Sequence, residues 1–178
     1  MTIYKAVYNF WFEEAHPRQW YQKDSNFDQL IRQRFGEVHN KARNEELHEW
    51  RETPKGSLSE IIVLDQFSRN IYRDQAEAFA CDELALQCSR TAIAKGYNDQ
   101  LKGSEKNFLY MPFMHSESKE VHQEAMKYFS EPGMALEYEL KHKEIIDRFG
   151  RYPHRNKILG RESTPEEIEF LKGPGSSF

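Results

Sequence analysis

Two stretches of the chain combine arginine with asparagine in a way that could bind an anion. They are 64–73 (LDQFSRNIYR) and 149–161 (FGRYPHRNKILGR). Guanidinium groups bind carboxylates and phosphates bidentately, and asparagine side chains can orient a bound group. We therefore predict that the two stretches meet in one pocket for a small anionic molecule or an acidic peptide end. The candidate ligand-binding residues are Arg69, Asn70, Arg73, Arg151, His154, Arg155, Asn156 and Arg161.

The alternative for the same arginines is a purely structural polar cluster. Asp65 precedes Arg69 by four residues, which is the favoured order for an ion pair on a helix. Such pairs, with Asn70 and Asn156 bonded to loop backbone, would fix how the last helix docks on the central one. Buried arginine is costly without a partner. One nearby aspartate cannot neutralise five guanidinium groups, however, and this count favours a ligand-binding pocket.

A further candidate site is the sequence HSE at 115–117. His115 and Glu117 could be a general base and its orienting carboxylate, able to activate a water molecule or a hydroxyl group. His154 is a second candidate for the base. The arginines would then stabilise developing negative charge, which describes a hydrolase acting on a phosphate or carboxylate ester. The alternative is that His115 and Glu117 cap a helix and bond its unpaired N–H groups.

Other kinds of site find little support in the sequence. Two Glu-x-x-His pairs, at 45–48 and 139–142, have the spacing of di-iron bundles, but such sites also need glutamates from two further helices. His142 is better explained as a hydrogen-bonded core histidine. We predict neither a metal nor a cofactor, because phosphate loops, Cys-x-x-Cys pairs and dinucleotide fingerprints are absent. No nucleophile elbow occurs, and a formal net charge of −4 argues against nucleic acid as a partner.

The composition is that of a soluble globular protein. Of 178 residues, 38% are apolar and 30% are charged, and a chain of this length normally forms one domain. We predict a single domain over 1–172 and a frayed tail over 173–178. Apolar runs such as 61–64 fall far short of the roughly 20 residues that cross a bilayer. Because the two cysteines indicate buried thiols in a reducing compartment, we expect a cytoplasmic protein without membrane contact.

The elements that would hold these residues are helices throughout. Apolar residues recur at helical spacing, and no alternating strand pattern of useful length occurs. Short links imply antiparallel hairpins, and the segment after 57–60 should be central because it is apolar on nearly all sides. Gly96, Pro112 and Gly150 are each expected to end a helix. About seven helices are predicted, and there are eight candidate segments: 3–12, one from a cap at Ser25 or Asn26, one from a capping box at 57–60, and 75–95, 104–111, 116–130, 135–149 and 165–171.

Three motifs also carry a family resemblance. They are LDQFSRNIYR at 64–73, MPFMHSE at 111–117 and FGRYPHRNKILGR at 149–161, followed by STPEE at 163–167. In this order they resemble the largely bacterial family catalogued as domain of unknown function 924. The resemblance implies a fold similar to tetratricopeptide-type helical hairpins wound into a compact right-handed superhelix, in a cytoplasmic setting. It implies no activity, so the function must be argued from the chemistry of the site.

Overall fold

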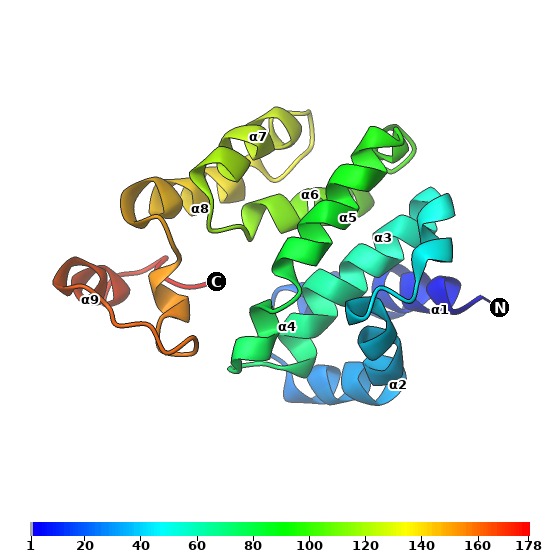
Figure 1. Cartoon of the computed structure of the whole chain (residues 1–178), viewed down its shortest axis with the longest axis horizontal. Helices are drawn as coiled ribbons and strands as arrows, with labels where there is room; N and C mark the ends of the chain where they lie inside the picture. The colour runs from blue at the N-terminus through cyan, green and yellow to red at the C-terminus, as the bar shows by residue number, and fades with distance from the viewer. Residues whose placement is uncertain (1) are drawn as a thin grey trace.

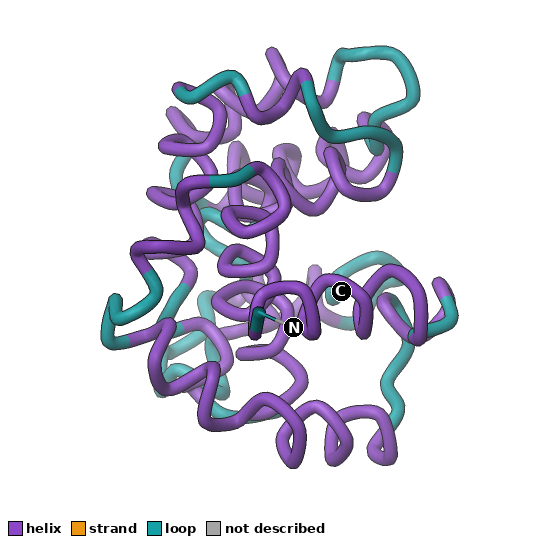
Figure 2. The backbone as a smooth tube through the Cα atoms, turned by 90° about the vertical axis from the view of Figure 1, so that its right-hand side faces the viewer, coloured by secondary structure: helices purple, strands orange, loops and turns teal. Residues whose placement is uncertain are grey.

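The structure, a computed structural model that describes residues 2–178, consists of helices and the links between them (Figure 1). The helices are α1 (Ile3–Asn9), α2 (Ser25–Arg43), α3 (Pro54–Ile62), α4 (Ser68–Ile71), α5 (Asp82–Ala94), α6 (Ser104–Met114), α7 (Lys119–Phe129), α8 (Leu136–Phe149) and α9 (Pro165–Leu171). No strand occurs within residues 2–178, and the tube in Figure 2 alternates between helix and loop. The all-α prediction is confirmed, whereas the tetratricopeptide-like winding stays a prediction. Among the helices described, none is long and apolar enough to cross a membrane.

The centre of the molecule is one rod made of α3, the π-helical turn Val63–Phe67 and α4. Its side chains at Leu58 and Leu64 are fully buried, as expected for a helix that is apolar on nearly all sides. Helices α1 and α5 pack against α3, and α2 packs against the α4 end (Figure 1). The last turns of the rod therefore carry Asp65 and Arg69 into the interior of the protein.

The rod begins earlier than the sequence predicts. Thr53 caps it by accepting a backbone N–H of the first turn at 3.1 Å. Pro54 occupies the first helical position, where its missing N–H costs no hydrogen bond. The predicted capping box at 57–60 is therefore wrong. Glu60 lies buried inside the helix and accepts two hydrogen bonds from Arg51, both at 2.7 Å.

The predicted helix 75–95 is divided in two. A 3₁₀ turn spans Ala76–Phe79, and α5 begins only at Asp82. Asp82 thus lies in the first turn of a helix, where a carboxylate is favoured by the helix dipole. This division brings Asp82 and the ring of Phe79 to the same cavity.

Helix α6 does not stop at Pro112, as predicted, but continues to Met114. Phe113 and Met114 are buried, and their burial offsets the hydrogen bond that the proline removes. The next helix, α7, is capped by Ser118, whose Oγ accepts the N–H of Val121. Consequently 115–117 is a link between two helices rather than a helix start.

The C-terminal third follows the sequence closely. Gly150 ends α8 with φ of 71°, as predicted. Thr164 and Glu167 form the capping box that starts α9. The tail 173–178, which the sequence predicts to be frayed, instead returns to the body of the protein, where the ring of Phe178 stacks on His142 with centroids 3.8 Å apart.

Candidate functional site

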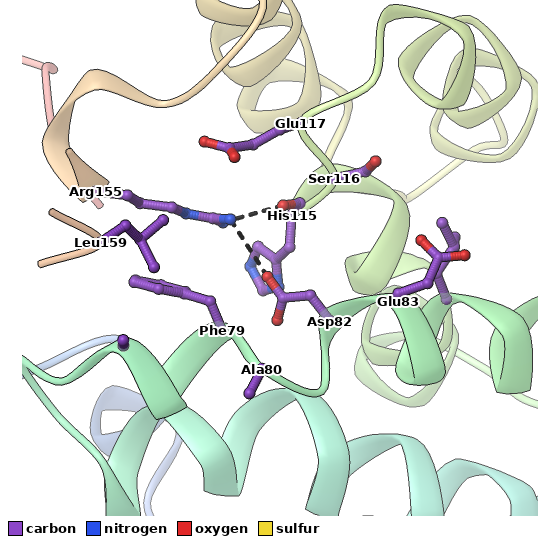
Figure 3. A pocket seen from close by; sticks show the side chains of 11 residues that line it. Phe79, Ala80, Asp82, Glu83, His115, Ser116, Glu117, Arg155 and Leu159 are labelled. Atoms are coloured by element: carbon purple, nitrogen blue, oxygen red, sulfur yellow. Dashed lines mark hydrogen bonds and ion pairs between the residues drawn. The ribbon is translucent and has the colours of Figure 1, made fainter. Parts of the chain in front are cut away.

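A cavity of about 330 Å³ opens between the start of α5, the link from α6 to α7, and the 149–161 segment (Figure 3). It brings together three of the predicted site residues, His115, Glu117 and Arg155, from two distant parts of the sequence. One wall is apolar and the other is polar. The apolar wall comprises Ala76, Phe79, Ala80, Leu86 and Leu159, and the polar wall comprises Asp82, Glu83, His115, Ser116, Glu117 and Arg155.

Asp82 joins the two arginine-bearing stretches. Arg69 donates to its two carboxylate oxygens at 2.7 and 3.0 Å, and Arg155 donates to one of them at 3.3 Å. The stretches 64–73 and 149–161 therefore meet, at this one carboxylate. The sequence does not predict Asp82 as a site residue, because a helix that begins at 75 would place it in the helix interior. The available signal was its pairing with a second acidic residue, which is typical of a first helical turn.

Arg155 is held firmly at the edge of the cavity. Its guanidinium carbon lies 4.4 Å from the centroid of the Phe79 ring and 4.7 Å from that of Tyr152. Both rings present their faces to the cation, an arrangement that stabilises it. One nitrogen donates to the backbone carbonyl of His115 at 3.0 Å, while Nε is buried and has no hydrogen-bond partner within residues 2–178.

His115 lines the cavity and is oriented by Asp65. Its Nδ1 lies 2.6 Å from Oδ1 of Asp65, a carboxylate that also accepts from Arg69 at 3.2 Å and from Gln66 at 2.7 Å. Burial alone would raise the pKa of Asp65, but the charge of Arg69 and the hydrogen bonds from His115 and Gln66 lower it well below its ordinary value. An ionised carboxylate can only accept, so Nδ1 of His115 carries the proton and Nε2 keeps its lone pair.

This arrangement gives His115 the properties of a general base. Burial lowers its pKa, and the charge of Arg69 lowers it further, while Asp65 acts in the opposite direction. The net shift is downward, so the ring is neutral at pH 7. Nε2 makes no hydrogen bond to any residue that the structure describes, and it can accept a proton from a molecule in the cavity.

Glu117 is not the partner of His115, contrary to the prediction. Arg161 donates to its two oxygens at 2.8 and 2.9 Å, and the N–H of Tyr152 donates at 2.7 Å. Burial would raise the pKa of Glu117, but these hydrogen bonds lower it. Capping does not describe the two residues either, because Ser118 caps α7. The side chains of the link instead turn toward different neighbours.

The link that carries His115 is held by its backbone. The carbonyls of 114–116 each accept a hydrogen bond from a side chain. In order, the donors are the hydroxyl of Tyr152 at 2.5 Å, the guanidinium of Arg155 at 3.0 Å and Nε2 of His122 at 2.8 Å. Two of the three donors belong to the 149–161 segment. This segment therefore positions His115 as well as contributing Arg155 to the cavity.

Two predicted residues lie away from the cavity. Asn70 donates its amide to Asp28 of α2 at 2.7 Å, and Arg73 donates to the same carboxylate at 2.7 Å. Both side chains therefore turn toward α2, and neither lines the cavity. The structure does not bring them together with Arg155.

Three more predicted residues form a separate polar cluster against α9. Arg151 donates to both oxygens of Glu167 at 2.7 and 2.8 Å, and Asn156 donates to one of them at 3.2 Å. Arg161 completes the cluster with a hydrogen bond to Asn156 at 2.9 Å. The cluster joins α9 to the 149–161 segment, whereas the structural alternative predicts that the last helix docks on the central one.

His154 also lies outside the cavity lining. Its ring packs against those of Tyr152 and Phe178. Burial is the main cause that lowers its pKa to about 4, and its buried Nδ1 has no hydrogen-bond partner within the described part of the chain. His154 therefore has no access to a molecule bound beside His115.

The expectation of excess positive charge is wrong. Each of the five predicted arginines has a carboxylate partner, and all of these partners except Asp65 come from other elements of the fold. They are Asp65, Asp82, Asp28, Glu117 and Glu167. The arginines were counted against one local aspartate, and tertiary contacts supply the rest.

Within residues 2–178 no group of three or more histidine, cysteine or acidic side chains could hold a metal ion. Glu139 pairs with His122 at 2.6 Å, both fully buried, rather than with His142. His142 bonds the carbonyl of Tyr138 at 2.7 Å, which confirms its prediction as a hydrogen-bonded core histidine.

Comparison with known proteins places the chain in a family. A family model described as bacterial protein of unknown function (DUF924) matches residues 7–175. The chain belongs to the DUF924 family. A solved structure of a protein of unknown function from Agrobacterium tumefaciens, ATU0120, is similar to this DUF924 chain, with 37% identity and a TM-score of 0.92 over 96% of this chain and 98% of the other.

No curated protein matches the chain. The DUF924 resemblance is confirmed by the family match, and both the family and the similar structure are described as being of unknown function. The function must therefore be inferred from the cavity and its charges.

Proposed function

We propose that this DUF924 protein binds a small molecule with an apolar body and a neutral or positively charged polar group. The apolar body would lie on Phe79, Leu86 and Leu159, and the polar group would face Glu83. The observation that carries this proposal is the charge pairing around the cavity. The guanidinium groups near it are paired with carboxylates, and Glu83 is the lining carboxylate that has no cationic partner within residues 2–178.

The pairing can be followed residue by residue. Arg69 lies between Asp65 and Asp82 at 3.2 and 2.7 Å, and Arg155 also reaches Asp82. Arg161 is bound bidentately to Glu117. Glu83 of α5, by contrast, accepts a hydrogen bond from the amide of Gln87 at 3.3 Å and forms no ion pair with a residue that the structure describes. The cavity therefore has a small excess of negative charge.

The excess of negative charge in the cavity disfavours the anionic ligand that the sequence suggested. An anion would have to displace a carboxylate from an arginine, and breaking a buried ion pair costs roughly 3–5 kcal/mol. An ammonium group beside Glu83 would instead gain up to about 1 kcal/mol, the usual value of an exposed ion pair. The competing proposal is that the cavity binds a small anion or an acidic peptide end. It predicts that the cavity prefers a negatively charged ligand.

The test uses three probes that share one ring and differ in charge, namely benzylamine, benzyl alcohol and benzoate. Dissociation constants are measured by thermal-shift titration at low ionic strength, since ligand at 100 times its dissociation constant adds about 2.7 kcal/mol of stability. We expect benzylamine to bind several-fold more tightly than benzyl alcohol, and benzoate to bind most weakly. Benzoate or phosphate binding most tightly would refute the proposal in favour of the anionic ligand.

Two variants test whether the preference for benzylamine arises at Glu83. Glu83→Gln should abolish the preference for benzylamine over benzyl alcohol. Glu37→Gln changes the same chemistry at an exposed position on α2 and should leave the preference intact. A preference for benzylamine that survives Glu83→Gln would show that the amine binds elsewhere.

We also propose a cytoplasmic location. Its support is that Cys81 and Cys88 are buried and unpaired, as the sequence predicted. Burial is the main cause that raises the pKa of both thiols, to about 12 for Cys88, so both stay protonated and inert in a reducing compartment. Fractionation of cells that produce the protein tests this location.

A further inference from the structure

We propose that the cavity hydrolyses small carboxylic esters, with His115 as the general base and Arg155 as the group that stabilises the oxyanion. This activity rests on the proposed function, because the ester must occupy the same cavity as the bound molecule. It goes beyond binding in assigning a reaction and a role to each polar group of the cavity wall.

The first support is the geometry of the base. Asp65, 1% exposed, lies 2.6 Å from Nδ1 of His115 and fixes both the orientation and the tautomer of the ring. Nε2 has no protein partner among the described residues, while the ring lines the cavity. His122 differs, because it bonds through both nitrogens, to Glu139 and to a backbone carbonyl.

The second support is the position of the cation. In Figure 3 the guanidinium of Arg155 extends across the cavity directly beside the ring of His115. Its hydrogen bonds to Asp82 and to the His115 carbonyl, together with the rings of Phe79 and Tyr152, fix it before any ligand arrives. A donor that needs no reorganisation stabilises developing negative charge most effectively.

The reaction balances without any further reactant than water. Nε2 of His115 accepts a proton from a water molecule as the water oxygen bonds to the carbonyl carbon, and the carbonyl electron pair moves to the oxygen beside Arg155. The tetrahedral intermediate then collapses, the bond from carbon to the alkoxy oxygen breaks, and the imidazolium of His115 returns its proton to that oxygen. The products are a carboxylic acid and an alcohol, and the histidine is again neutral.

The substrate class follows from the charges of the wall. A phosphate ester carries negative charge at neutral pH and would approach Glu83, the lining carboxylate that has no ion pair with any residue described. A carboxylic ester is neutral, and its acyl group can lie on the apolar wall formed by Phe79 and Leu86. The cavity therefore favours the carboxylic ester.

The experiment measures release of nitrophenol from 4-nitrophenyl acetate and from 4-nitrophenyl phosphate by the full chain. We expect turnover of the acetate and none of the phosphate. His115→Gln should lower kcat/KM for the acetate by roughly 100-fold or more, the usual contribution of a general base. His48→Gln removes an exposed imidazole and should change nothing. Equal rates for His115→Gln and His48→Gln would overturn the proposal, as would faster hydrolysis of the phosphate.

Asp65 acts as a positioning residue, and a separate readout tests that role. Asp65→Asn should lower kcat with little change in KM, because binding is unaffected when only the base is disoriented. Benzylamine titration of each variant shows whether the cavity is intact. Benzylamine binding without His115-dependent hydrolysis would refute the reaction while leaving the binding function in place, and loss of both would refute both.

Discussion

Asp82 offers the sharpest test of how the cavity is held together. It accepts hydrogen bonds from Arg69 at 2.7 and 3.0 Å and from Arg155 at 3.3 Å, and its side chain is 16% exposed. The substitution Asp82→Asn keeps the size of the side chain and one acceptor oxygen but removes the charge. Arg69 would retain Asp65, whereas Arg155 would retain only a backbone carbonyl.

The expected cost follows from these contacts. Removing one partner of a buried ion pair costs about 3–5 kcal/mol, because the remaining charge is left without compensation. Because Arg69 keeps a second carboxylate, we expect a loss at the lower end of this range. The free energy of unfolding should fall by about 3 kcal/mol. For a chain of this length that corresponds to a fall in Tm of roughly 6–12 °C.

The matched control is Glu83→Gln, the neighbouring residue of α5. Both positions lie in the first turn of the helix, so the loss of a favourable interaction with the helix dipole is common to the two variants. Glu83 is exposed and its substitution should change stability by no more than about 0.5 kcal/mol. Urea unfolding of both variants without ligand provides the comparison. Asp82→Asn unfolding within 0.5 kcal/mol of the control would refute the idea that this carboxylate joins the two arginine stretches.

Two further predictions concern stability. Gly36→Ala should stabilise α2 by up to about 1 kcal/mol, because nothing lies within 4 Å of the added Cβ. Gly56→Ala should instead destabilise by about 1–3 kcal/mol, because its Cβ would collide with the backbone carbonyl of Trp50, and thermal unfolding of the pair gives opposite signs if both are right. Hydrogen bonds from Arg151 are the main cause that lowers the pKa of Glu167 from 4.5 to about 2, so the stabilisation is complete above pH 4.5 and is lost as the pH falls toward 2. Glu167→Gln should remove up to about 3 kcal/mol at pH 7 and flatten the stability curve in that acid range, and an unchanged curve in urea unfolding would contradict the assignment.

For the central rod, helical periodicity predicts the position in the fold but not the first residue. A segment that is apolar on nearly all sides has few places to lie except the centre, so its position could be predicted. Its start could not, because Pro54 and Ser57 both carry valid signals for a helix N-terminus. Only the buried ion pair between Glu60 and Arg51 decides between them, and that contact is tertiary.

The candidate site likewise could be predicted only in part from the sequence. The meeting of 64–73 with 149–161 could be predicted from their shared composition. The atoms that join them could not, because Arg155 and its partner Asp82 are 73 positions apart. For the same reason His115 was matched with its neighbour Glu117, when the residue that orients it is Asp65, 50 positions earlier in the chain.

The structural and functional interpretations of the arginines are connected by one physical cause. Arg161 pairs with Glu117, and Arg155 and Arg69 pair with Asp82, so the cavity wall has no net positive charge that would favour an anionic ligand. Arg155 and Arg161 also donate to the carbonyl of His115 and to Glu117, and so help to hold the link whose His115 ring Asp65 orients. A guanidinium left unpaired to bind an anionic ligand would also leave part of that link unsupported. The arginine–carboxylate pairs that help to hold the link around His115 therefore also make the cavity favour neutral and cationic molecules.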